Sequence, residues 1–203
     1  MKLFNVLLAA TCLFLLGSTG HAQTRIVALG DSNIKGKGLL ENDAYPAKLE
    51  RALRAKGQNV TVKNAGINGD TTKGVLSRMN SDVPQGTQIV ILSVGINDTF
   101  EGTSAATINT NINKIIGNLR ARNIEVMYFG APTGQGNPAR RAELEAMGVT
   151  VVPALQDGIA DDPNLHVEAS KLAPNKYHLN SAGYDIVVAR TLPQVEALIA
   201  KVK

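Results

Sequence analysis

A run of apolar residues ends in a polar turn in the stretch Arg25-Ile26-Val27-Ala28-Leu29-Gly30-Asp31-Ser32. Residues 25–29 are typical of a strand that is covered on both faces of a sheet. The Gly-Asp-Ser that follows predicts a tight turn from this strand into a helix. The stretch therefore predicts a buried strand with an exposed Ser32 hydroxyl at its end.

Short apolar runs and helical stretches alternate along the rest of the chain. The predicted strands are 25–29, 60–64, 88–94, 125–129 and 149–152, and the predicted helices are 43–56, 71–79, 104–122, 138–147 and 181–201. This alternation, without a repeat or a linker, predicts one α/β domain in which helices cover both faces of a five-stranded parallel sheet.

Four residues that could take part in catalysis are expected to meet at one edge of that sheet. Ser32, Gly69 and Asn97 follow the first, second and third strands, and His178 precedes the last helix. Ligands of open parallel sheets bind outside the carboxyl ends of the strands. A hydroxyl nucleophile, an imidazole base and two hydrogen-bond donors at this edge are the groups that acyl transfer to water requires.

Each of these residues also has an ordinary structural explanation. Ser32 is a good helix cap, and Gly69 belongs to an Asn-Gly turn. Asn97 is equally able to tie down a loop, and a single histidine such as His178 is usually structural. The order and placement of all four carry the interpretation.

The first residues are interpreted as a secretory signal and not as part of the fold. Lys2 precedes an apolar stretch over 3–16, and Gly20-His21-Ala22 offers small residues for cleavage after Ala22. The apolar stretch is shorter than the roughly 20 residues that span a bilayer. We therefore expect a signal peptide over 1–22, a single domain over 23–203, and a periplasmic or secreted protein with no membrane segment after cleavage.

Composition excludes several classes of function. The 203-residue chain is 44% hydrophobic and 19% charged, which is typical of a globular protein. Its only cysteine, Cys12, lies in the signal, so no disulfide or thiolate metal site is expected. A formal charge of +4 without a dense basic run argues against nucleic-acid partners.

The chain resembles the GDSL, or SGNH, family of serine hydrolases, and most of all the bacterial lysophospholipase/thioesterase I and arylesterase branch. The resemblance rests on four ordered blocks, residues 28–32, 64–71, 94–98 and 178–184. It implies a flavodoxin-like α/β/α sandwich, with no cofactor and no metal. It also implies Ser32 as nucleophile, His178 as base, and an oxyanion hole made by Ser32, Gly69 and Asn97.

Two positions depart from the family pattern. Asn33 replaces the usual leucine and places a polar group beside the nucleophile. Asn175 stands where the family has the aspartate of its triad, three residues before His178. An amide can orient an imidazole, but it cannot stabilise an imidazolium by charge. Asp157, Asp161, Asp162 and Glu168 are candidate substitutes.

The sequence leaves three functions open. The first is an exported esterase or thioesterase that acts on small-molecule, lipid or glycan acyl esters. The second is a polysaccharide O-acetyl esterase, although the chain is only 4% aromatic and has no tryptophan for stacking on sugars. The third is a non-catalytic binder of acyl or glycan ligands that has lost the acidic residue at Asn175.

Substrate choice is expected to depend on loops around the site. Phe100 and residues 130–136 are predicted to wall an acyl pocket. Lys35 and Lys37 either favour anionic substrates or are solvated loop residues. His166 is predicted to be exposed in a polar loop without a helix start beside it.

Overall fold

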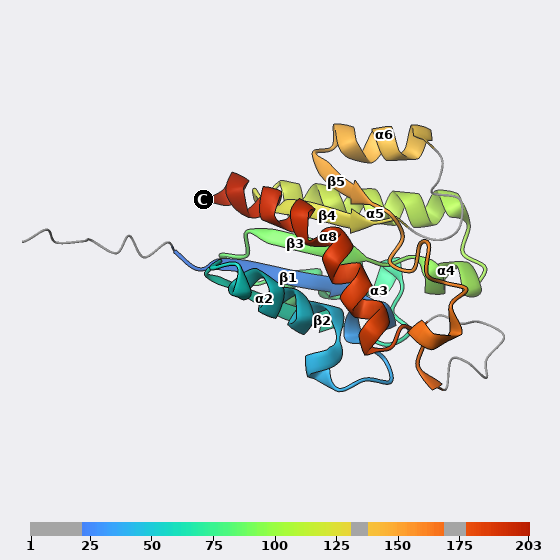
Figure 1. Ribbon diagram of the computed structural model, residues 1–203. Coiled ribbons are helices and arrows are strands. Elements are labelled where there is room, and N and C mark those ends of the chain that lie inside the picture. The colour runs from blue at the N-terminus through green and yellow to red at the C-terminus, as the bar shows by residue number, and fades with distance from the viewer. Residues whose placement is uncertain (1–21, 131–137, 169–177) are drawn as a thin grey trace, which may run out of the picture.

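A five-stranded, all-parallel sheet forms the centre of the protein (Figure 1). The computed structural model describes residues 22–130, 138–168 and 178–203. The strands are β1 (Thr24–Gly30), β2 (Val60–Gly66), β3 (Ile89–Ser93), β4 (Glu125–Phe129) and β5 (Val149–Val152), in the order β2-β1-β3-β4-β5. This is the flavodoxin-like order, in which the topological switch point lies between β1 and β3. The predicted fold class is confirmed.

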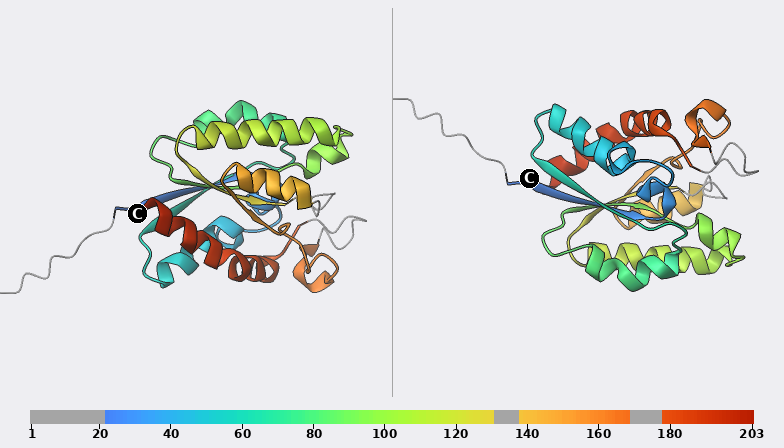
Figure 2. Two further views of the ribbon diagram at one scale, coloured as in Figure 1. Left: turned by 90° about the horizontal axis from the view of Figure 1, so that it is seen from above. Right: turned by 90° about the horizontal axis from the view of Figure 1, so that it is seen from below.

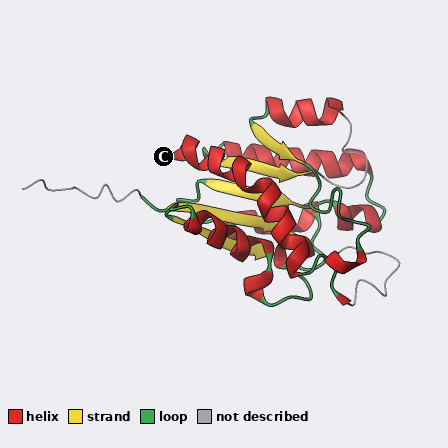
Figure 3. Cartoon of the chain, viewed as in Figure 1, coloured by secondary structure: helices red, strands yellow, loops and turns green. Residues whose placement is uncertain are grey.

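Helices cover both faces of the sheet (Figures 2 and 3). Side chains alternate between the faces of a strand, so Ile26 and Ala28 of β1 enter one core and Val27 and Leu29 enter the other. The first core is closed by α2 (Tyr45–Ala55) and α8 (Ser181–Val202). The second is closed by α3 (Thr72–Asp82), α5 (Ala105–Arg120) and α6 (Pro138–Ala146). Burial on both faces explains why the strands have continuous apolar sequences.

The ends of the helices follow local chemistry. Thr71 and Ser104 cap α3 and α5 by accepting hydrogen bonds from the backbone N–H groups of Gly74 and Thr107. The α3 helix reaches Asp82, three residues beyond the predicted end at Met79. Its last turn is polar, but it is held by an ion pair between Arg78 and Asp82.

Four short helices lie at loops that the apolar pattern did not mark as helical. They are α1 (Ser32–Lys35), α4 (Ile96–Phe100), and the 3₁₀ turns η1 (Glu41–Asp43) and η2 (Pro163–Leu165). The α1 and α4 helices directly follow the turns after β1 and β3. Both of them therefore place residues at the carboxyl edge of the sheet.

The predicted signal segment lies almost wholly outside the described residues. Within the ranges that the structure describes, no helix is both long and apolar enough to cross a bilayer.

Gly66→Ala is expected to destabilise the protein by about 1–3 kcal/mol, the usual effect of overpacking. A Cβ at this position would lie 2.2 Å from the Lys35 backbone nitrogen and 2.8 Å from the Asp31 carbonyl oxygen. Urea unfolding measures the change in the free energy of unfolding. The matched control is Gly117→Ala within α5, where a Cβ meets no atom within 4 Å. That exchange is expected to stabilise by about 0.5–1 kcal/mol. Equal effects of the two exchanges would contradict the packing described here.

Candidate active site

Ser32 is held at the carboxyl end of β1 by tight backbone packing. A Cβ on Gly30 would lie only 1.9 Å from the Ser93 carbonyl oxygen, so no larger residue fits between β1 and β3. The next residue, Asp31, donates its N–H to that same carbonyl at 3.2 Å. Its side chain caps α1 by accepting the Asn33 N–H at 2.8 Å. Ser32 is thereby fixed as the first residue of α1.

The Ser32 hydroxyl and the His178 imidazole meet. The distance from Ser32 Oγ to His178 Nε2 is 3.0 Å, within hydrogen-bond reach. Ser32 is buried as a residue, with 7% exposure. The tight turn and the imidazole cover the side chain while leaving its oxygen paired with a base.

His178 is positioned by a short antiparallel pairing of residues 165–167 with 178–180. The Val167 N–H donates to the His178 carbonyl at 3.0 Å, and the Asn180 N–H donates to the Leu165 carbonyl at 2.8 Å. Asn180 also caps α8 by accepting the Gly183 N–H. The imidazole is thus anchored by its own backbone at the start of the last helix.

Burial lowers the pKa of His178, and electrostatic interactions with Lys37 and His166 lower it further. A histidine with a lowered pKa is neutral at pH 7 and can accept a proton. The environment therefore favours the base form of the imidazole.

Gly69 lies in the turn that follows β2, and Asn97 lies in α4, which follows β3. Gly69 has φ +78°, a conformation that favours glycine, and a Cβ there would meet no atom within 4 Å. The need for glycine is therefore conformational, and open space borders its backbone. The Asn97 amide donates one hydrogen bond to the Asp70 carbonyl at 2.8 Å, so one of its two N–H groups is committed.

The backbone N–H groups of Ser32 and Gly69 have no acceptor among the described residues. Together with the second N–H of the Asn97 amide, they can supply three donors to an anionic oxygen. Within the described ranges, no three His, Asp or Glu side chains gather closely enough to hold a metal ion.

An ion pair and a capping network hold the donor loops in place. Arg78 pairs with Asp70 at 2.6 Å and donates to the carbonyls of Gly30 and Ala65, both at 2.9 Å. Asp98 accepts from the Thr72 N–H at 2.8 Å and from its hydroxyl at 2.5 Å. These contacts join the ends of β1 and β2 to α3 and α4. The sequence analysis missed them, although Asp70 and Asp98 belong to the motif blocks.

His166 is buried, with 1% exposure, so the prediction of a surface residue is wrong. The 3₁₀ turn over Pro163–Leu165 directly precedes His166, and the backbone of His166 forms an isolated antiparallel bridge with Leu179. Both of its ring nitrogens are buried without a hydrogen-bond partner in the described part of the chain. The polar sequence around His166 concealed this pairing because the pairing is made with a distant segment.

The remaining predicted site residues have mixed outcomes. Asn175 lies outside the described residues. So do residues 131–136, which make up all but the first residue of the loop predicted to wall an acyl pocket. Asp162 caps η2 by accepting the Asn164 N–H at 2.9 Å. Phe100, at the end of α4, is 54% exposed.

Asn33 makes two contacts besides the capping bond. Its backbone carbonyl accepts the Tyr184 hydroxyl at 2.6 Å, and its side-chain oxygen accepts from Gln156 at 3.4 Å. Asn33 therefore links α1 to α8.

Comparison with known proteins identifies the family. Residues 28–186 match the GDSL-like Lipase/Acylhydrolase family, so the chain belongs to that family. Its relatives include a protein named arylesterase from Vibrio mimicus, 32% identical over 64% of this chain and 66% of that protein. Another is Esterase TesA from Pseudomonas aeruginosa, 32% identical over 62% of this chain and 64% of that protein. The matching stretch thus spans slightly less than two thirds of either relative.

A solved structure supports the same assignment. The crystal structure of AlinE4, an SGNH-hydrolase family esterase, is 31% identical with a TM-score of 0.62. The match covers 86% of this chain and 96% of that one. The resemblance seen in the four sequence blocks is confirmed.

Asp31→Asn is expected to stabilise the protein at pH 7. Burial, with smaller contributions from Asp70 and Asp98, raises the pKa of the Asp31 carboxyl from 3.8 to about 6. The folded protein therefore binds an extra proton between these values, and its stability falls as the pH rises through that window. The amide keeps an oxygen for the cap and carries no charge. The free energy of unfolding of Asp31→Asn should exceed that of the parent by up to about 3 kcal/mol above pH 6.5, and by little below pH 3.5.

Urea unfolding from pH 3.5 to 7.5 measures this difference. The control is Asp185→Asn, since Asp185 is exposed on α8 and pairs with Lys48. A stability difference between Asp31→Asn and the parent that stays constant with pH would contradict the burial of an ionisable Asp31.

Proposed function

We propose that this protein is an exported serine esterase or thioesterase of broad acyl range. The observation that carries the proposal is the 3.0 Å contact of Ser32 Oγ with His178 Nε2. The proposed oxyanion donors are the Asn97 amide and the backbone N–H groups of Ser32 and Gly69, which have no acceptor among the described residues. Membership of the GDSL-like lipase/acylhydrolase family and the names of the esterase relatives support it. Export rests on the predicted signal over residues 1–22.

In the first half of the reaction, Ser32 Oγ attacks the ester carbonyl while His178 Nε2 takes its proton. The carbonyl oxygen becomes an oxyanion that accepts hydrogen bonds from the Ser32 and Gly69 N–H groups and the Asn97 amide. The carbon–oxygen bond to the alcohol then breaks, and His178 gives its proton to the departing alcohol. An acyl group remains on Ser32.

In the second half, water replaces the alcohol. His178 takes a proton from the water as its oxygen attacks the acyl carbonyl, and the same three donors hold the new oxyanion. The bond to Ser32 Oγ breaks, His178 returns the proton to the serine, and a carboxylic acid leaves. For Nε2 to accept a proton in each half, Nδ1 must carry the other proton. Asn175, in the family's aspartate position, is proposed to orient that Nδ1–H through its amide oxygen.

Ser32→Ala is expected to abolish hydrolysis of 4-nitrophenyl acetate, because the nucleophilic oxygen is removed. Asn97→Ala is expected to lower kcat about 10²–10³-fold through the loss of one oxyanion donor. Release of 4-nitrophenolate measures both. Asn118→Ala on the exposed side of α5 is the control and should keep the parent rate. Hydrolysis that persists in Ser32→Ala contradicts the mechanism, and a parent without hydrolysis of any ester favours a non-catalytic binder.

The relative rates of parent protein on acetyl esters, decanoyl esters and acetylated xylan separate the esterase from the polysaccharide O-acetyl esterase. A clear preference for acetylated xylan would overturn the broad acyl range.

Asn175→Asp is expected to raise kcat/KM about tenfold or more. It is also expected to raise the pH below which kcat/KM falls. A carboxylate stabilises the imidazolium that forms in the transition state and raises the pKa of His178. In the parent, the lowered pKa of His178 places the loss of activity below pH 6.5. The pH dependence of kcat/KM measures both effects. If kcat/KM and its pH dependence were both unchanged, another group would have to orient and stabilise the imidazole.

A further inference from the structure

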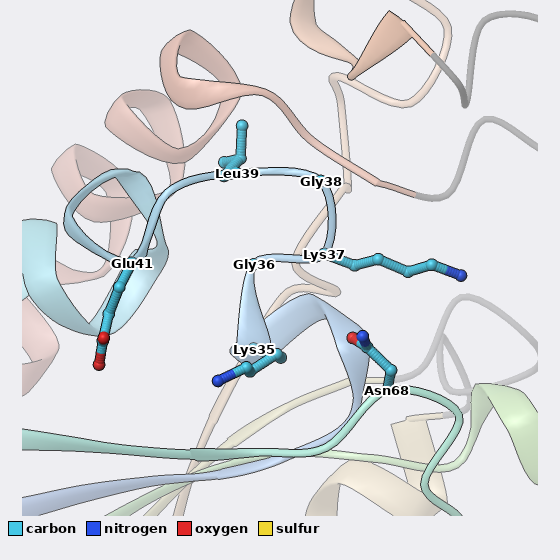
Figure 4. A pocket seen from close by; sticks show the side chains of 7 residues that line it. All are labelled: Lys35, Gly36, Lys37, Gly38, Leu39, Glu41 and Asn68. Carbon is cyan, nitrogen blue, oxygen red and sulfur yellow. The ribbon is translucent and has the colours of Figure 1, made fainter.

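The loop that follows the nucleophile carries two lysines beside a hollow. A hollow of about 190 Å³ is lined by Lys35, Gly36, Lys37, Gly38, Leu39, Glu41 and Asn68 (Figure 4). Asn68 directly precedes Gly69, and the loop directly follows α1. The hollow therefore adjoins the oxyanion donors, and the mechanism proposed above makes no use of it.

The loop is fixed to the nucleophile by its backbone. The Gly36 and Lys37 N–H groups both donate to the Ser32 carbonyl, at 3.0 and 3.1 Å. The Asn64 amide donates to the Lys35 carbonyl at 3.3 Å. Gly36 has φ +77°, and a Cβ there would lie 2.5 Å from the Ala44 Cβ. The backbone of Lys37 thus has a set position relative to Ser32.

The charge of Lys37 is available to a ligand. Lys35 and Lys37 are exposed, and neither ammonium pairs with a carboxylate in the described part of the chain. By contrast, Lys48 and Lys56 pair with Asp185 and Glu196. In Figure 4 the Asn68 amide points up toward the loop near Lys37, whereas the Glu41 carboxylate points away from both.

Lys37 also acts on the reacting centre, since its charge is one cause of the lowered pKa of His178. The positive potential of Lys37 therefore reaches the reacting centre, where it would also attract a negatively charged group on a substrate whose carbonyl contacts Ser32. The Asn68 amide can add a hydrogen bond to the same group.

We propose that Lys37 is a specificity-determining residue that favours esters carrying a carboxylate or phosphate close to the scissile bond. This inference rests on the proposed esterase function. The anionic group takes the place of solvent at the hollow, between the Lys37 ammonium and the Asn68 amide. Lys35 adds to the positive potential of the loop.

The test compares anionic esters with neutral esters of the same shape. The pair 4-acetoxybenzoate and 4-acetoxybenzamide places the charge on the alcohol. The pair 4-nitrophenyl hydrogen adipate and its primary amide places the charge on the acyl group. The ratio of kcat/KM within each pair is the selectivity, and it is measured at pH 8.5, where His178 is neutral.

The parent should prefer the anion in at least one pair, and Lys37→Gln should lower that selectivity about fivefold. Charge reversal in Lys37→Glu should lower it more than tenfold. Selectivity of the parent should fall as NaCl increases, while that of Lys37→Gln should not. The matched control, Lys114→Gln on the exposed side of α5, removes one positive charge and should keep the parent selectivity.

The failures of the two proposals are distinguishable. If the parent hydrolyses the neutral esters through Ser32 but Lys37→Gln leaves both ratios unchanged, the inference is overturned and the esterase proposal stands. If the parent hydrolyses no ester, the esterase proposal fails first. Circular dichroism of each variant checks that the fold is retained.

Discussion

Close backbone packing at the carboxyl ends of β1, β2 and β3 is the constraint on which the site depends. Gly30 lies against the Ser93 carbonyl, and Gly66 lies against the first turn of α1, with no room for a Cβ at either place. Arg78 then donates hydrogen bonds to the carbonyls of Gly30 and Ala65, which end β1 and approach the end of β2. Because the strands end side by side, the loops that follow them are forced into one small region.

The charges around this region are divided between two sides. The carboxylates of Asp31, Asp70 and Asp98 lie beneath the turn, and their proximity helps to raise the pKa of Asp31. Electrostatic interactions with Lys37 and His166 lower the pKa of His178. The family's triad places a carboxylate at the position of Asn175, which would act in the opposite direction. In the proposed mechanism, His178 is therefore favoured as a neutral base, and an amide at position 175 would not stabilise its imidazolium by charge.

Local pattern and motif order predicted most of the fold, and they named Ser32 and His178, whose side chains the structure brings within 3.0 Å. The strands were visible because burial on both faces makes them apolar throughout. The burial of His166 was not visible, because it depends on pairing with a segment twelve residues later and not on its own polar neighbours. The α4 helix was missed because a helix of five residues is too short to show apolar periodicity. The support given by Arg78 depends on strand ends that only the assembled sheet brings together.

Labelling of the intact protein with a fluorophosphonate tests the central claim most directly, because the reagent forms a covalent bond only with a serine whose proton a neighbouring base can accept. Peptide mass spectrometry should find the phosphonate on Ser32, and the rate of labelling should fall strongly in His178→Ala. A label on another serine, or equal labelling of Ser32 without His178, would contradict the account.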